Sequence, residues 1–122
     1  MPASNEMPLR VGLVEIRPDE HAAFCAGRRL NLTGRELALL TELARRPDRT
    51  ATRGELYAAV WGGRLRDGDR SVDVYVRKLR AKLARVKPEA TFIETDFGFG
   101  YRLVAANSPD LSQLLHNAVT SA

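Results

Sequence analysis

The sequence predicts an α+β fold in which a small antiparallel sheet is followed by three helices and a β-hairpin. Three observations predict it. Short apolar, β-branched stretches separated by turns occupy residues 9–32 and are typical of strands. Between residues 33 and 87, two capping boxes and a long amphipathic segment indicate three helices. Two extended stretches around a glycine-punctuated turn indicate a hairpin over residues 91–104.

The first strands are short and close together. Apolar and β-branched residues run from Leu9 to Ile16, and turn-forming pairs divide them from the strand candidates that follow. Residues 1–8 are expected to form a flexible leader, because they lack the basic and then apolar pattern of a signal peptide. The later strand candidates are Ala22–Cys25 and Arg28–Leu32, with turns at Pro18-Asp19 and Ala26-Gly27.

A capping box begins the first predicted helix. The Thr33 hydroxyl is placed to accept a hydrogen bond from the Glu36 backbone N–H, and the Glu36 carboxylate to accept one from the N–H of Thr33. The helix is expected to end near Arg46, because Pro47 cannot continue it. Its apolar residues recur at helical spacing and are Leu37, Leu40, Leu43 and Ala44.

A second capping box, Thr52 with Glu55, begins the next helix after a brief extended link at Thr50-Ala51. Gly62-Gly63 ends this helix, and residues 61–69 form a longer connection than a tight helix-turn-helix uses. One face of the helix is expected to carry Leu56, Ala59 and Val60.

The third predicted helix begins near Asp69 and ends near Val86, ahead of Pro88. One apolar stripe has spacings of four, three, four and three residues, so it lies on one side of the helix and is expected to pack against the first two helices. The stripe consists of Val72, Val76, Leu79, Leu83 and Val86. The opposite face consists of Arg70, Val74, Arg77, Lys78, Ala81 and Arg85.

The positive charge of the chain is concentrated on this helix. The chain carries a net charge of +4, but residues 70–87 contain seven Lys or Arg and one acid (+6), so the remainder is slightly acidic. Such an excess indicates a polyanion-binding surface, although a solvated helix face gives a similar pattern. The face lacks balancing Glu residues at helical spacing, and its position between two capped helices and a hairpin matches a winged helix-turn-helix.

Each residue of the outer face has an expected role on duplex DNA. Val74 and Ala81 allow close approach to bases, and Val74 is placed to touch a thymine methyl group. Arg77 and Lys78 are expected to donate to guanine edges or phosphates, and the terminal Arg70 and Arg85 to phosphates. Asp73 is expected to orient Arg70 or Arg77. The predicted DNA-binding set is Arg70, Ser71, Asp73, Val74, Arg77, Lys78, Ala81, Arg85, Thr95 and Phe97.

Other classes of function are not expected. The single cysteine, Cys25, excludes an intrachain disulfide, fits the reducing cytoplasm and is interpreted as a small core residue. No apolar run has the roughly 20 residues that cross a bilayer. His21 and His116 have no ligand cluster near them, so no metal or other cofactor is predicted. No nucleophile, base and acid occur together, so an enzyme is not expected, and Trp61 is interpreted as a core or loop anchor.

The C-terminal extension, residues 105–122, is expected to form a short extra helix. Ser108 is an N-cap candidate, followed by Pro109 at the first helical position. Its apolar stripe either covers the protein's own surface, forms a dimer contact or docks on a partner. The stripe consists of Leu111, Leu114, Leu115 and Val119.

Four motifs in this order resemble the effector domain of OmpR/PhoB-type response regulators over residues 9–104. The resemblance implies a four-stranded N-terminal sheet, three helices and a C-terminal hairpin. It also implies a third helix in the major groove, a hairpin wing in the minor groove, a loop from Trp61 to Asp69 that contacts RNA polymerase, and tandem dimers on direct repeats. The motifs are residues 32–40 (LTGRELALL), 52–62 (TRGELYAAVWG), 70–83 (RSVDVYVRKLRAKL) and 93–103 (IETDFGFGYRL).

The sequence departs from this family in its wing and in its domain content. The family carries a basic residue just before the first wing glycine, where this chain has Phe97. Phe97 cannot donate a hydrogen bond and Asp96 repels phosphate, so we expect a larger share of recognition from the third helix. Phe97 and Phe99 are then left to pack on sugars or on a neighbouring protomer. No receiver domain is present, so the chain is either a separated effector domain or a protein regulated in another way.

Two functional hypotheses follow. The first is a sequence-specific transcription regulator that binds double-stranded DNA through its third helix, about residues 69–86. The alternative is a winged-helix interaction module that contacts RNA polymerase or a regulator through the 61–69 loop and the C-terminal helix. Binding to duplexes from a random pool separates them.

Overall fold

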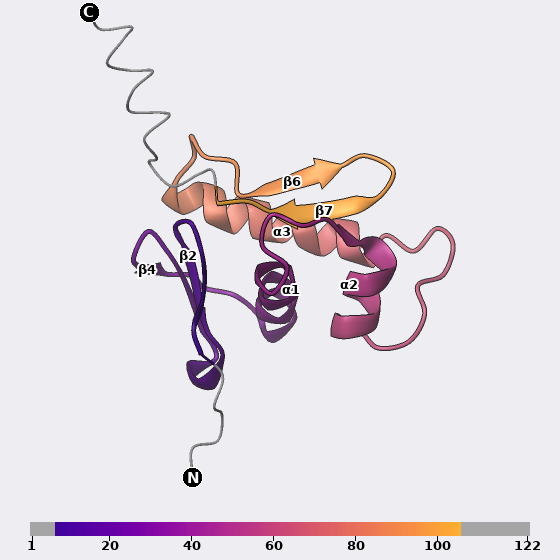
Figure 1. The fold of residues 1–122 in the computed structure, drawn as a ribbon, viewed down its shortest axis with the longest axis horizontal. Coiled ribbons are helices and arrows are strands. Elements are labelled where there is room, and N and C mark those ends of the chain that lie inside the picture. Colours follow the sequence, from indigo (N-terminus) through magenta and orange to yellow (C-terminus); the bar gives the residue numbers. More distant parts are fainter. Residues whose placement is uncertain (1–6, 106–122) are drawn as a thin grey trace, which may run out of the picture.

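Two small antiparallel sheets and three helices surround a shared apolar core (Figure 1). The computed structural model describes residues 7–105, so most of the predicted leader and all but Ala105 of the predicted C-terminal helix lie outside the described residues. The elements, in chain order, are β1 Leu9–Val11, β2 Val14–Arg17, the 3-10 helix η1 Pro18–Glu20, β3 Ala22–Cys25, β4 Arg28–Arg29, α1 Gly34–Ala44, β5 Ala51–Thr52, α2 Arg53–Val60, α3 Ser71–Val86, β6 Ile93–Asp96 and β7 Gly100–Leu103.

The N-terminal sheet has the strand order β1-β2-β3-β4, with every neighbouring pair antiparallel. The apolar stretch from Leu9 to Ile16 forms two strands, because Gly12 adopts a φ of +58° and turns the chain between them. The last strand ends at Arg29, short of the predicted Leu32. Alternation then places Val14, Ile16 and Cys25 in the core.

The second sheet has the order β5-β7-β6 and contains a strand that the sequence did not reveal. The predicted link before α2 is β5, in which Ala51 pairs with Tyr101 and Thr52 with Gly100. A Cβ atom at Gly100 would lie 1.9 Å from the carbonyl oxygen of Ala51, so only glycine allows the two strands to approach this closely. The predicted hairpin is thereby attached to the start of α2.

Both predicted capping boxes are present. In α1, the Thr33 N–H donates to Glu36 Oε1 at 2.8 Å and the Glu36 N–H donates to Thr33 Oγ1 at 3.2 Å. In α2, the corresponding distances for Thr52 and Glu55 are 2.9 and 3.0 Å. The first helix ends at Ala44 with Arg45 as its C-cap, close to the predicted end near Arg46. One detail was predicted wrongly: Ala59 is exposed, and Leu56 is the buried residue of α2.

The third helix packs through the predicted stripe. Val72, Val76, Leu79 and Leu83 are buried, and Val86 is half-buried against the same core. Its start, Ser71, lies two residues after the predicted Asp69. The reason is local: Asp69 Oδ1 accepts hydrogen bonds from the Ser71 backbone N–H at 2.8 Å and from its hydroxyl at 2.5 Å, so Asp69 lies in a turn outside the helix, whose N-cap is Arg70.

A single buried charge ties α3 to α1. Glu36 is 2% exposed, and no other charged or polar residue in the described chain is buried to this degree. Lys82 Nζ donates to Glu36 Oε1 at 2.6 Å and to the Asn31 carbonyl at 2.7 Å. Burial opposes ionisation of Glu36, but the bonds from Lys82 and Thr33 outweigh it and hold the pKa of this carboxyl below its usual value.

We predict that Lys82→Met lowers the free energy of unfolding by about 1–3 kcal/mol, because methionine keeps the packing of the side chain but leaves a buried carboxylate without its cation. The lowered pKa of Glu36 means that its contribution is present at neutral pH and is lost as pH falls through that pKa. The difference between the two proteins should therefore shrink in acid. Urea unfolding at several pH values measures both effects.

The matched control is Lys87→Met, since the ion pair of Lys87 with Glu89 (2.9 Å) is solvent-exposed and should matter little. Equal losses in the two variants would contradict the structural role of the Glu36–Lys82 pair.

Candidate nucleic-acid interface

The outer face of α3 is the one that the sequence predicts. Burying the apolar stripe leaves the opposite side of the helix open to solvent, as helical periodicity requires. Its residues Arg70, Val74, Arg77, Lys78, Ala81 and Arg85 are all exposed.

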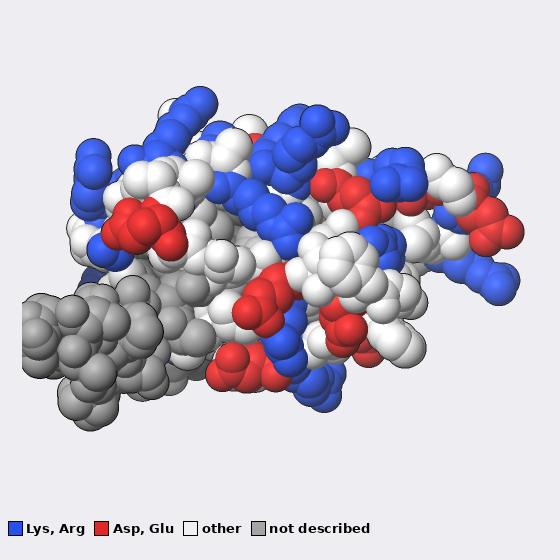
Figure 2. Space-filling model, turned by 90° about the horizontal axis from the view of Figure 1, so that it is seen from above, with Lys and Arg blue, Asp and Glu red and all other residues white. Residues whose placement is uncertain are grey.

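The cations on this face are largely unpaired. Within residues 7–105, the side chains of Arg77 and Arg85 make no ion pair or hydrogen bond, and Lys78 contacts the Tyr75 ring, with Nζ 4.5 Å from the ring centroid. Figure 2 shows Lys and Arg side chains in a band over α3, which lies behind the hairpin in Figure 1. Unpaired guanidinium groups between small side chains suit a polyanion with flat, hydrogen-bonding edges.

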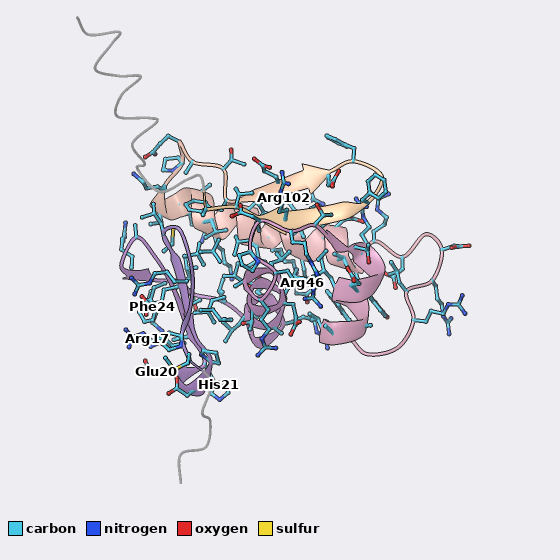
Figure 3. The ribbon with its side chains drawn as sticks, viewed as in Figure 1. Arg17, Glu20, His21, Phe24, Arg46 and Arg102 are labelled. Carbon is cyan, nitrogen blue, oxygen red and sulfur yellow. The ribbon has the colours of Figure 1, made fainter. Side chains whose placement is uncertain are left out.

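One charged cluster of the N-terminal sheet, around Arg17, behaves differently. Arg17 Nε lies 2.8 Å from Glu15 Oε2, its Nη1 lies 3.2 Å from Glu20 Oε2, and its guanidinium covers the Phe24 ring. Figure 3 shows Arg17, Glu20, His21 and Phe24 together at the end of this sheet, away from α3. The hydrogen bond to Glu15 raises the pKa of Arg17. This cluster satisfies its own charges and leaves little free charge for a ligand.

Two predicted site residues at the start of α3 have partners within the protein. Arg70, the residue before the helix, is 77% exposed, and its Nε lies 3.3 Å from Asp73 Oδ2. The Ser71 hydroxyl already donates to Asp69, so it has only acceptor capacity for a ligand.

Asp73 joins α3 to two other elements. Asp73 was expected to orient Arg70 or Arg77, and it forms an ion pair with Arg70 and not with Arg77. Its Oδ1 also accepts hydrogen bonds from Arg53 Nε at 2.8 Å and from the Tyr101 hydroxyl. Sequence reasoning missed Arg53 and Tyr101, which lie 20 and 28 residues away from Asp73 along the chain.

The wing holds the remaining predicted residues, Thr95 and Phe97. Thr95 is partly buried, and its hydroxyl accepts a hydrogen bond from Arg80 Nη2 at 2.8 Å. The same guanidinium donates to the Ile93 carbonyl at 2.8 and 3.1 Å. Arg80 was not predicted as a site residue, and it attaches the middle of α3 to the edge strand of the hairpin.

The wing tip is apolar and its acids are paired. Phe97 is 86% exposed and Phe99 is 66% exposed. Asp96 accepts a hydrogen bond from the Thr50 hydroxyl at 2.8 Å, and Glu94 pairs with Arg102 at 2.6 Å. A groove of about 540 Å³ separates the wing from α3, with Arg80, Ala84 and Phe97 among its lining residues.

The loop between α2 and α3 is anchored by aromatic contacts at its start. The Trp61 ring stacks on Tyr57, with centroids 5.4 Å apart, and meets Tyr75 edge-on at 5.3 Å. The predicted role of Trp61 as an anchor is therefore confirmed. Arg64 and Arg66 are exposed on the loop and form no ion pair within residues 7–105.

Two classes of site are absent from the described residues. Residues 7–105 contain no group of three His, Cys, Asp or Glu side chains that could hold a metal ion. The same part of the chain has no helix with the length and apolar character to span a bilayer.

Comparison with solved structures gives close matches to DNA-binding domains. The DNA-binding domain of CpxR from E. coli superposes with a TM-score of 0.74 and 33% sequence identity, over 83% of this chain and 99% of that one. The Klebsiella pneumoniae RstA DNA-binding domain, solved in complex with the RstA box, gives a TM-score of 0.73 and 27% identity, over 82% and 99% of the two chains.

Comparison with curated proteins and family models agrees. The chain is 38% identical to the transcriptional regulatory protein SrrA of Staphylococcus aureus over 90 residues, which are 73% of this chain and 37% of SrrA. It thus spans little more than a third of the length of this relative. Residues 27–103 match the family model described as "Transcriptional regulatory protein, C terminal". The chain therefore belongs to this family of OmpR/PhoB-type effector domains, as its four motifs predicted.

Proposed function

We propose that the domain is a sequence-specific transcription regulator that binds double-stranded DNA with α3 in the major groove. The observation that carries the proposal is the outer face of α3, on which Arg77, Lys78 and Arg85 form no ion pair within residues 7–105 and surround the small side chains of Val74 and Ala81. An α-helix fits the major groove, where base edges present donors, acceptors and the thymine methyl group. The DNA-binding domain of RstA, to which this domain is similar, is solved in complex with the RstA box.

The proposed contacts divide by their position along the helix. With 16 residues, α3 is roughly 24 Å long, about twice the width of the major groove. Central residues therefore face bases, and terminal ones face the two backbones. We assign Val74, Arg77, Lys78 and Ala81 to base edges, and Arg70 and Arg85 to phosphates. Ser71 lies beside Arg70, and its hydroxyl oxygen accepts rather than donates.

The wing is proposed to add apolar contacts. Phe97 and Phe99 project from its tip, and Thr95 lies between the tip and Arg80. Aromatic side chains without a donor pack on deoxyribose or against a neighbouring protomer. We further propose that copies of the domain bind side by side on repeated sites, that DNA binding takes place in the cytoplasm, and that the domain catalyses no reaction of its own.

A second candidate function concerns the loop between α2 and α3. Arg64 and Arg66 are exposed and form no ion pair with any described residue, and the Trp61 stack holds the start of the loop on the body of the domain. The loop has no net charge, because Asp67 and Asp69 balance its two arginines, but its exposed guanidinium groups suit carboxylates on a protein surface. We propose RNA polymerase as its partner.

We predict that Arg77→Ala combined with Lys78→Ala lowers the affinity for a duplex selected from a random pool by about a hundredfold or more, because two base-reading donors are lost. The unfolding free energy should stay nearly unchanged, since both side chains are exposed. The charge-matched control is Arg28→Ala with Arg29→Ala on β4, which removes the same charge from the N-terminal sheet. Similar losses in both double variants would show that bulk charge, not the face of α3, drives binding.

A phosphate contact should leave a different signature. Arg85→Ala is expected to weaken binding to selected and random duplexes alike, and to reduce the slope of log affinity against log salt concentration by about 0.9. Titrations at four or more salt concentrations measure the slope. A slope that does not change would remove Arg85 from the interface.

For the loop, we predict that Arg64→Ala with Arg66→Ala reduces transcription by purified polymerase from a promoter carrying the selected site, while DNA affinity stays within about twofold, because solvent-screened charges off the outer face of α3 contribute little. A parallel fall in DNA affinity would place the loop on DNA instead. Unchanged transcription would exclude it as the polymerase contact.

A further inference from the structure

The carboxylate of Asp73 lies where three elements meet. It belongs to the first turn of α3, it accepts a hydrogen bond from Arg53 at the start of α2 at 2.8 Å, and it accepts another from the hydroxyl of Tyr101 in β7. Its side chain is 17% exposed. The two bonds fill the same oxygen, Oδ1, and fix the direction of the carboxylate.

The second oxygen points toward the outer face. Asp73 Oδ2 lies 3.3 Å from Arg70 Nε, and within residues 7–105 the Arg70 side chain forms no hydrogen bond and no other ion pair. Arg70 is highly exposed, so nothing else in the described chain limits its orientation. One carboxylate therefore connects an interface arginine to α2 and to the wing.

The chemistry of the cluster keeps this connection rigid. Burial opposes ionisation of Asp73, but the hydrogen bonds from Tyr101 and Arg53 dominate, and the pKa of Asp73 lies below its usual value. Burial and the neighbouring carboxylate raise the pKa of Tyr101, so its hydroxyl remains a donor. The guanidinium of Arg53 covers the Tyr101 ring at 5.0 Å, and that of Arg80 does so at 5.5 Å.

We infer that Asp73 is a positioning residue of the DNA interface: it makes no base contact itself, and it sets the angle of Arg70 and of the wing relative to α3. The inference rests on the proposed function. It implies that the contact of Arg70 and the contacts of the wing depend on the same carboxylate.

The direction in which one substitution changes DNA affinity separates this role from a simple charge effect. A carboxylate near DNA repels phosphates, so removing it should strengthen binding to any duplex. A positioning role has the opposite consequence for the selected duplex, because a misdirected Arg70 and wing lose contacts there that random DNA never made in full.

The experiment compares the 122-residue protein with its Asp73→Asn variant on a selected and on a random duplex at one salt concentration. We expect the affinity for the selected duplex to fall about tenfold, while that for the random duplex holds or rises, so that the ratio falls at least tenfold. A ratio that stays constant, whether both affinities rise or not, overturns the inference. Absence of any enriched duplex with the wild-type protein instead overturns the proposed function, and this inference with it.

A double-mutant cycle gives a readout that loss of stability does not reproduce. Arg70→Ala should cost clearly less in the Asp73→Asn background than in the wild type, because the asparagine has already released Arg70. Arg85→Ala, which shares no partner with Asp73, should cost the same in both backgrounds. Additive effects for Arg70 would contradict the inference.

A second variant covers the case in which Asp73→Asn does not fold, as judged by circular dichroism and thermal unfolding. Tyr101→Phe removes only the hydroxyl and keeps the ring that Arg53 and Arg80 cover. We expect it to lower the ratio of selected to random affinity severalfold, less than Asp73→Asn. An unchanged ratio in a folded Tyr101→Phe protein would leave the wing uncoupled from Asp73 and overturn the inference.

Discussion

The rest of the structure depends on the packing of α3. One side of this helix lies at the centre of the apolar core, and the other side is the proposed binding surface. Val72, Val76, Leu79 and Leu83 are each at most 1% exposed, and burying a side chain of this kind contributes about 1.5–3 kcal/mol. Because successive residues are about 100° apart, this burial also decides which residues face outward. The apolar stripe and the cationic face are thus one constraint, and substitutions on the outer face should change binding with little effect on stability.

Two carboxylates orient this helix at its two ends. Glu36 of α1 accepts a hydrogen bond from Lys82 in the C-terminal half of α3. Asp73, in the first turn of α3, accepts hydrogen bonds from Arg53 and Tyr101. Hydrogen bonds outweigh burial at both acids and lower both pKa values, so both contributions are present at neutral pH and are lost as pH falls through the lowered values. Apolar packing sets the rotation of α3 about its axis, while these polar contacts attach it to particular neighbours.

Local patterns predicted the helices and most of the strands, but not β5 or the long-range polar contacts between elements. The partners in a capping box, and the successive residues of the α3 stripe, are only three or four residues apart in the sequence, and the structure contains both features. Strand β5 has two residues and is defined only by β7, about fifty residues later, so no local signal marks it. Arg80 follows buried Leu79 and reads as one more cation of a basic helix, yet it bonds Ile93 and Thr95. The predicted site set therefore held the outward residues and omitted Arg53, Arg80 and Tyr101, whose partners come from the tertiary fold.

The charges of the wing indicate which part of the proposed interface attracts phosphates and which part makes apolar contacts. Glu94 is paired with Arg102, and Asp96 is hydrogen-bonded to Thr50, so the acids of the wing are engaged within the domain. Its tip presents Phe97 and Phe99, which carry no charge. In the proposed complex, attraction to phosphates comes from α3, while the wing acts by packing, which responds weakly to salt. Packing requires a defined angle between wing and helix, and the bonds of Asp73 and Arg80 to the hairpin add directional polar contacts to the shared apolar core that joins the two.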